Sequence, residues 1–224
     1  MRKLIASTML SLDGIMQAPG GPEEDPSGGF AFGGWTFPHF DESMGDNMHG
    51  LDAKDRELLL GRRTYEIFEA YWPYQSDDNP IAKTFNATRK HVVSRSLTQD
   101  KLQWANSTLL PDDIVAAITA LKAQPGKDLQ IIGSGNLIQT LQGAGLIDEY
   151  NTFTFPVVLG RGKRLFEAGA KPGGLKLVGS ETSKTGVVMS TYVPAGEVVV
   201  GSFAEEVPSG REIERRNKWG REAG

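Results

Sequence analysis

Short apolar runs recur along most of the chain, and segments of a different period separate them. The runs lie at residues 3–10, 57–61, 91–94 and 129–132. Such runs predict strands that are buried on both faces of a sheet. Between them, apolar side chains recur at steps of three and four residues. These helical segments are 41–53, 62–72, 112–123 and 136–144. Strands that alternate with helices in this way predict an α/β fold with a largely parallel sheet and helices on its faces.

The pattern changes after residue 170. Two alternating strands, 175–183 and 186–194, are joined by a Ser-Lys-Thr-Gly turn and predict an antiparallel hairpin. Residues 205–224 interleave Arg and Glu and predict a solvent-exposed tail or a late helix. We therefore expect a single domain over residues 1–200 and a charged tail over 201–224.

Residues 18–34 are rich in Pro, Gly and acidic side chains. This composition predicts an exposed, flexible loop rather than a packed element. Long loops in compact domains often cover functional sites. A loop that is tolerated because it is harmless is an equally open interpretation.

Composition narrows the range of functions. The formal net charge is −4, which argues against a protein that coats nucleic acid. Cysteine is absent, which removes disulfides and thiolate ligands and fits a cytoplasmic location. The three histidines, His39, His49 and His91, lack the spacing of metal ligands, so no metal is expected. We expect a small-molecule partner rather than nucleic acid.

The N-terminal segment also bears on location. Its basic start and short apolar run are broken by polar residues, and no cleavage pattern follows, so a first core strand is expected rather than a signal peptide. No apolar run approaches the ~20 residues of a membrane-spanning helix. We expect no membrane partner.

Three strand-to-helix junctions share one chemical character. They are Gly61-Arg62-Arg63-Thr64, Ser94-Arg95-Ser96 and Gly133-Ser134-Gly135-Asn136. In a parallel sheet such turns emerge at the carboxyl ends of the strands and line one edge. Helix N-termini and guanidinium groups bind phosphate well. Each motif alone is weak, because a glycine turn is often only a helix cap and an Arg is often only surface. Together they favour a dinucleotide.

The motifs carry a family resemblance. STMLSLDGIM, LLLGRRTYEIF, HVVSRSL and IIGSGNLIQTL followed by LIDEYNTFTFPVVLGRGKRLF resemble the dihydrofolate reductase superfamily. The chain is most similar to the branch that contains the riboflavin-biosynthesis reductase (RibD C-terminal) domain and its stand-alone relatives. The resemblance covers residues 1–194. It implies a dihydrofolate reductase-like three-layer fold, a mostly parallel central sheet with a C-terminal antiparallel hairpin, NADPH as cofactor and a homodimer.

The resemblance also implies which residues hold the cofactor. Those carried over are Ala6, Ile15, Gly61, Arg62, Arg63, Thr64, Ser94, Arg95, Gly133, Ser134, Gly135, Asn136 and Leu137. Thr64 is expected to cap the helix beneath the pyrophosphate. Ser94 and Arg95 are expected to hold the ribose and its 2′-phosphate, which implies NADPH rather than NADH.

Two carboxylates are candidates for contact with the substrate. Asp13 follows the first strand, and we expect it to act as the catalytic group by a hydrogen bond or a proton transfer. An Asx turn that closes the strand is nearly as good an interpretation. Dihydrofolate reductases place a carboxylate on the first helix. Asp41 is one of three acidic residues in that region, with Glu42 and Asp46, and none of them aligns uniquely.

Two further groups are candidates for substrate binding. Trp35, with Phe37, is suited to stack on a flat heterocycle, although core packing explains such aromatic rings equally well. Arg161, with Lys163 and Arg164, is suited to receive a substrate phosphate. A charged surface turn is the alternative.

These expectations lead to one predicted activity. The chain is expected to be an NADPH-dependent reductase that transfers a hydride to a small pterin-like or aminopyrimidine-like heterocycle. A non-catalytic NADPH-binding module of the same fold is the alternative. An ordinary doubly wound dehydrogenase is disfavoured, because the turn at residues 11–14 lacks the glycine fingerprint.

Overall fold

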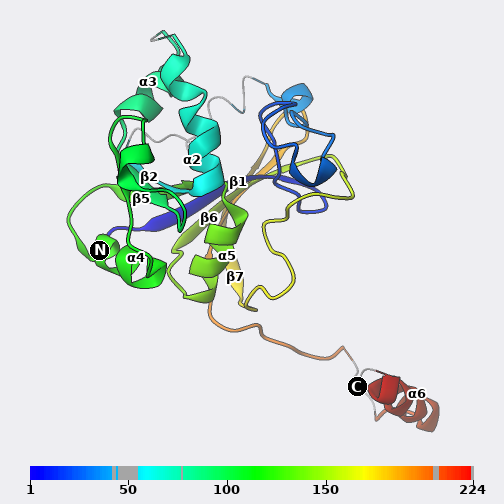
Figure 1. The fold of residues 1–224 in the computed structure, drawn as a ribbon. Helices are drawn as coiled ribbons and strands as arrows, with labels where there is room; N and C mark the ends of the chain where they lie inside the picture. The colour runs from blue at the N-terminus through cyan, green and yellow to red at the C-terminus, as the bar shows by residue number, and fades with distance from the viewer. Residues whose placement is uncertain (42–43, 45–54, 77, 204–206, 223–224) are drawn as a thin grey trace.

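The computed structural model describes residues 1–41, 44, 55–76, 78–203 and 207–222. Its strands are β1 (Leu4–Ser11), β2 (Arg56–Gly61), β3 (Lys90–Val93), β4 (Ser107–Leu109), β5 (Asp128–Ile132), β6 (Glu149–Phe155), β7 (Leu175–Thr182) and β8 (Val188–Pro194). Its α-helices are α2 (Arg62–Glu69), α3 (Pro80–Ala87), α4 (Ile114–Ala123), α5 (Gly135–Gly143) and α6 (Gly210–Glu222). Figure 1 shows how these elements are arranged.

The strands form one eight-stranded sheet in the order β4-β3-β2-β5-β1-β6-β8-β7. The strands from β4 to β6 in this order pair in parallel. β8 runs antiparallel to both of its neighbours, β6 and β7. The predicted dihydrofolate reductase-like fold is therefore confirmed, with its mostly parallel sheet and its C-terminal hairpin.

Helices cover the sheet on both faces. On one face, α4 and α5 bury Ile118, Ile138 and Leu141 against alternate residues of the central strands. On the other face, α2 and α3 bury Tyr65 and Phe85 in one cluster with Leu58 of β2. Because side chains alternate between the faces of a strand, β2 contributes Leu59 to the first cluster and Leu58 to the second. The result is a three-layer arrangement (Figure 1).

A third apolar cluster corrects the expectation that residues 18–34 form an exposed loop. Phe30 and Trp35 are buried there with Phe155 of β6. The rings of Trp35 and Phe155 meet edge to face, with centroids 5.3 Å apart. The Trp35 Nε1 donates a hydrogen bond of 2.8 Å to the carbonyl of Gln17. Aromatic anchors therefore hold the segment to the sheet, although its turns remain on the surface.

Several predicted boundaries differ from the observed ones. The helix predicted at 62–72 ends at Glu69, and a 3-10 turn with Pro73 at its centre follows at Trp72–Tyr74. The helix predicted at 112–123 is capped by Asp113, whose carboxylate accepts from the Ala116 N–H. Of the helix predicted at 41–53, only residues 41 and 44 lie among the described residues. The strand β4 and the helix α3 were not predicted.

The hairpin of β7 and β8 agrees with the prediction to within a residue or two. The late helix α6 lies beyond an extended stretch of chain (Figure 1). None of the described residues of α6 is buried. Among the described residues, no helix is long and apolar enough to cross a membrane.

Candidate functional site

One serine joins two of the predicted turns at the carboxyl edge of the sheet. Ser134 follows β5, and its hydroxyl accepts a hydrogen bond of 3.0 Å from the Gly61 N–H at the end of β2. The same oxygen lies 2.6 Å from the Thr64 hydroxyl. Ser134 has a left-handed backbone, with φ of 59°. A Cβ on Gly61 would lie 2.9 Å from the serine oxygen, so glycine is required there.

The two helices that follow these turns have no side-chain cap. Gly61, the N-cap of α2, has no side chain to accept a hydrogen bond, and the side chain of Ser134, the N-cap of α5, accepts none from the first N–H groups of its helix. The expectation that Thr64 caps α2 is therefore wrong, because its hydroxyl bonds to Ser134 instead. Uncapped N–H groups at a helix start favour an anion.

The turn at Ser94-Arg95-Ser96 lies beside the turn that begins at Gly61. Gly61 of β2 is paired with Val93 of β3, so Ser94 and Arg95 emerge next to the start of α2. The Ser94 hydroxyl accepts hydrogen bonds from the backbone N–H of Ser96 and of Leu97, at 3.1 and 2.9 Å. Arg95 is exposed at this turn. The sheet thus places all three predicted turns on one edge.

The second glycine turn packs closely against the segment after β1. A Cβ on Gly135 would lie 3.0 Å from the sulfur of Met16 and 3.2 Å from the Arg164 carbonyl. Ile15 forms an isolated backbone bridge with Arg164 and is fully buried. Ala6 lies within β1, paired with neighbouring strands on both sides. Ile15 is therefore at the edge of this region, whereas Ala6 lies deeper in the sheet.

The other predicted cofactor residues are not equally free to bind. Arg62 forms an ion pair with Glu66 at 3.0 Å, and Arg63 donates to the Ser27 hydroxyl at 3.1 Å. Leu137 faces the core, whereas Asn136 is exposed at the first turn of α5. The structure thus brings the glycines and hydroxyls together and leaves the cations spread around them.

The carboxylate of Asp13 is bonded to groups of the chain itself in this structure. Its carboxylate accepts hydrogen bonds from the Ser11 hydroxyl at 2.7 Å and from the N–H groups of Leu159 and Gly160 at 3.1 and 2.9 Å. The Ser11 hydroxyl, ahead of these backbone donors, holds the pKa of Asp13 at about 2. The geometry fits the alternative of a turn-closing aspartate, and a carboxyl of this pKa does not hold a proton near neutral pH.

Two further predicted substrate residues, Trp35 and Asp41, also have internal partners. Trp35 is 8 % exposed and belongs to the core cluster described above. The Asp41 carboxylate accepts from the N–H groups of Met44 and Thr185, at 3.0 and 3.1 Å. Asp41 thus ties its segment to the turn of the β7–β8 hairpin. Trp35 and Asp41 are therefore both engaged with other parts of the chain.

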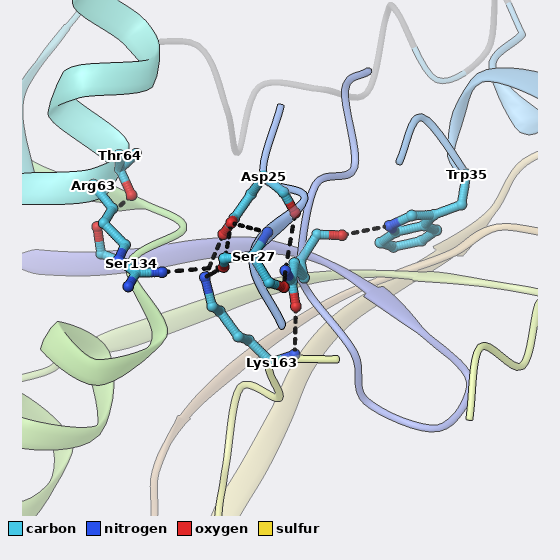
Figure 2. A network of polar contacts seen from close by, with 8 residues as sticks. Asp25, Ser27, Trp35, Arg63, Thr64, Ser134 and Lys163 are labelled. Atoms are coloured by element: carbon cyan, nitrogen blue, oxygen red, sulfur yellow. Dashed lines mark hydrogen bonds and ion pairs between the residues drawn. The ribbon is translucent and has the colours of Figure 1, made fainter. Parts of the chain in front are cut away.

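The basic turn at residues 160–164 is satisfied by oxygens of the chain itself. Arg161 donates to the Gly28 carbonyl at 2.7 Å. Lys163 forms an ion pair with Asp25, and Arg164 donates to the Asp13 carbonyl. The side chains of Asp25, Lys163, Arg63 and the Ser134–Thr64 pair lie in one view of the site (Figure 2).

Gln17 is a residue of the site that was not predicted from the sequence. It is 4 % exposed, and its Nε2 donates to the carbonyls of Asp25 and Ser27, both at 2.9 Å. Its Oε1 accepts from the Lys163 N–H at 3.0 Å. Since these partners are distant in sequence from Gln17 or on a loop, no local pattern could have identified it.

The arrangement fits the phosphates of a dinucleotide. Two uncapped helix starts, a left-handed serine and the exposed Arg95 share one edge of the sheet. Gly61 and Gly135 leave space where a side chain would collide with the neighbouring turn. Within the described residues, no group of three or more His, Asp or Glu side chains could hold a metal ion.

Known proteins of similar sequence and fold were compared with the chain. The uncharacterised protein YyaP of Bacillus subtilis (strain 168) is 29% identical over 194 residues, which cover 85% of this chain and 94% of that protein.

Two crystal structures share the fold. A putative riboflavin biosynthesis protein from Shewanella sp. PV-4 has a TM-score of 0.61 and 22% identity, and the match covers 87% of this chain and 99% of that one. A pyrimidine reductase-like protein from Corynebacterium diphtheriae has a TM-score of 0.55 and 14% identity, over 88% of this chain and 93% of that one.

The model of one protein family matches nearly the whole of the predicted domain. It is the RibD C-terminal domain, and the match spans residues 2–189. This agrees with the resemblance carried by the four sequence motifs, and it supports a reductase-type function. The chain belongs to the RibD C-terminal domain family.

Proposed function

We propose that the protein is an NADPH-dependent reductase that transfers a hydride to a small heterocycle of pterin-like or aminopyrimidine-like chemistry. The observation that carries the proposal is the Ser134 hydroxyl, which joins the turn after β5 to the turn after β2. This bond fixes two uncapped helix starts side by side at one edge of the sheet. A pyrophosphate fits such a pair of helix starts.

The cofactor would lie across this edge. Gly61, Thr64 and Ser134 would hold its pyrophosphate, and Ser94 with Arg95 would hold the ribose and its 2′-phosphate. A planar guanidinium suits a phosphate because it offers parallel donors. The backbone at Ile15 and at Gly135 would position the nicotinamide, which supplies the hydride when the cofactor is bound.

The protein's own part in the reaction would be binding and orientation. Met16 packs against Gly135 and the buried Ile15 packs against Gly162, and these apolar side chains would keep water from the floor of this region. A dry, fixed position for the reacting carbon is what hydride transfer requires. Asp13 remains our proposed substrate contact only as a hydrogen-bond acceptor, since its pKa of about 2 disfavours a role as proton donor.

A turnover assay tests the proposal. The purified chain is mixed with NADPH and a panel of oxidised pterins and aminopyrimidines, and the nicotinamide absorbance is followed. We expect the absorbance to fall with at least one member of the panel. Ser134→Ala should reduce that rate, because the two turns would lose their link.

A specific observation favours a second candidate, a non-catalytic NADPH-binding module. Asp13, Trp35 and Asp41, the residues predicted to contact substrate, are all engaged with the chain itself. Tight binding of NADPH with no oxidation across the panel would support this module and would contradict the reductase.

We also propose that the protein acts in the cytoplasm and as a homodimer, with no nucleic-acid partner. The exposed strand β7 supports the homodimer, because Leu175, Leu177 and Val178 are each about half exposed on it. A pocket of about 310 Å³ opens beside these residues and is lined in part by Tyr150 and Tyr192. Sedimentation velocity would test this, with a single monomeric species as the contrary result.

A further inference from the structure

Two cations near the predicted site share a single acceptor. Lys163 and Arg63 both donate to the Ser27 hydroxyl, at 2.8 and 3.1 Å (Figure 2). Lys163 also forms an ion pair with Asp25. One carboxylate and one hydroxyl of the 18–34 segment therefore serve both cations. We call Lys163 and Arg63 the anion site.

The oxygens that fill the anion site are themselves fully used. The Ser27 hydroxyl donates to the Asp25 carboxylate at 2.5 Å. A hydroxyl has one hydrogen and two lone pairs, so Ser27 has no further bonding capacity beyond Asp25, Lys163 and Arg63. The Asp25 side chain is 17 % exposed. Burial would raise the pKa of Asp25, but the hydrogen bonds from Lys163 and Ser27 outweigh it and leave the pKa below its usual value.

The position of these oxygens is fixed by a buried side chain. Gln17 holds the carbonyls of Asp25 and Ser27 through its Nε2 and the backbone of Lys163 through its Oε1. The same amide therefore sets the loop and the basic turn relative to each other. Because Gln17 is almost fully buried, this is a built contact rather than a surface encounter.

The chemistry of the anion site is that of a phosphate site. Lys and Arg side by side bind phosphate oxygens, and here Asp25 and Ser27 supply oxygens in their place. The site also lies near the proposed nicotinamide position. A Cβ on Gly162, in the same turn as Lys163, would lie 2.8 Å from the side chain of Ile15.

We propose that Asp25 is a specificity residue that fills the anion site, so that the substrate is a heterocycle without a phosphate group. This inference rests on the proposed function, because it concerns the substrate of that same site. A phosphorylated substrate would have to displace Asp25 from Lys163 and break the Ser27 bonds. An uncharged heterocycle could bind without breaking these contacts.

Calorimetric titration of the full chain with inorganic phosphate tests this directly. Wild type and Lys163→Gln should bind phosphate equally weakly, because Asp25 already masks the lysine. Asp25→Asn keeps the shape but removes the charge, and it should bind phosphate about tenfold more tightly, as expected for one charge-assisted contact. The double variant Asp25→Asn, Lys163→Gln should lose that gain.

Two results would overturn the proposal. One is wild-type protein that binds phosphate as tightly as Asp25→Asn. The other is a wild type whose phosphate affinity falls on Lys163→Gln, which would show that the lysine is available. This second comparison does not need Asp25→Asn to fold. Phosphate bound at the proposed cofactor turns would be common to all four proteins, so the differences between the variants, rather than the absolute affinity of the wild type, report on Lys163.

A turnover comparison then addresses the substrate. Wild type should reduce an aminopyrimidine at least about tenfold faster, by kcat/KM, than its ribosyl phosphate counterpart. In Asp25→Asn the kcat/KM values for the two compounds should be closer to each other. Faster turnover of the phosphorylated compound by wild type would overturn the inference, even with the reductase proposal intact.

Discussion

The Ser134 hydroxyl bonds to two groups that lie 70 and 73 residues away in the chain. Its left-handed backbone directs the side chain across to β2 rather than to the start of its own helix. Serine in this conformation costs more than glycine would, by about 1 kcal/mol. The hydroxyl bonds offset that cost. The strained backbone of Ser134 therefore places its hydroxyl where it holds the turn after β2 in position.

Two substitutions at Ser134 should distinguish the contribution of its hydroxyl bonds to stability from the cost of its strained backbone. Ser134→Ala keeps the strain and loses the bonds, so the free energy of unfolding should fall by about 1 kcal/mol. Ser134→Gly also loses the bonds but relieves the strain, so its free energy of unfolding should fall by less. Urea denaturation of the three proteins measures this. A glycine variant less stable than the alanine variant would contradict the assignment.

Asp13 makes the stability of the protein sensitive to acid. Its pKa is about 2 in the folded protein against an ordinary value of 3.8, so its ionised form stabilises the fold. That contribution is complete above pH 3.8 and is lost as the pH falls toward 2. The main cause is the hydrogen bond from the Ser11 hydroxyl.

Acid titration of stability should therefore distinguish two variants. Asp13→Asn should remove the part of the pH dependence that lies between pH 3.8 and about 2. Ser11→Ala, which keeps the carboxylate, should move the loss of stability to higher pH. Unfolding midpoints measured across this range check both. Identical profiles for wild type and Asp13→Asn would show that the carboxylate is not held as described.

At the scale of elements, the turn at 160–164 is fitted to the segment after β1. Gly162 has φ of 138°, and a Cβ there would lie 2.8 Å from Ile15 and 3.0 Å from Phe30. Gly160 has φ of 77° but no atom within 4 Å of such a Cβ. The two glycines share the need for an unusual backbone and differ in the space around them.

The pair offers a matched test of packing at this turn. Gly162→Ala should cost backbone strain and overpacking together, and should lower the free energy of unfolding by about 1–3 kcal/mol more than Gly160→Ala. Because Ile15 would have to shift, NADPH affinity should fall in Gly162→Ala alone. Denaturation and a cofactor titration of both variants check this. Equal losses would contradict the close contact with Ile15.

Elements with a strong period were predictable, whereas short ones were not. The strands before the three turns and the helices after Gly61 and Ser134 were correctly placed, because their apolar runs are bounded by glycine or polar residues. The junction at Ser94–Ser96 was wrongly predicted to open a helix, because a short 3-10 turn at Gln99–Lys101 and then β4 follow it. The helix α3 was missed, since its Phe85 is fixed by packing on Phe68 and Trp72, which are far from it in sequence. The three-residue β4 carries no period of its own.

At the scale of the molecule, the sheet order creates the candidate site. β2 lies beside β5, and β5 beside β1, so turns far apart in sequence meet at one edge. The sequence predicted that such turns share an edge, because parallel strands end on the same side. It could not predict the partner of Ser134 or the contacts of Gln17, because these depend on which strands are neighbours.

The C-terminal tail should contribute little to the fold. The described residues of α6 are not buried, and its ion pairs are internal, between Glu212 and the guanidinium groups of Arg215 and Arg216. A chain that ends at residue 200 should therefore keep its free energy of unfolding within about 0.5 kcal/mol. Denaturation of both lengths checks this. A larger loss would show that residues 201–224 pack on the domain.

The central claim is that the three turns form an NADPH site. Calorimetric titration with NADPH and NADH tests it most directly, on wild type, on Arg95→Ala and on Arg89→Ala as a control. Arg89 is a suitable control because it precedes β3, at the strand end opposite Arg95, and is exposed.

We predict that wild type and Arg89→Ala bind NADPH at least about tenfold more tightly than NADH, as expected for a charge-assisted contact to the 2′-phosphate. Arg95→Ala should bind the two cofactors with nearly equal affinity. Equal affinities in wild type, or a preference that survives Arg95→Ala, would contradict the account.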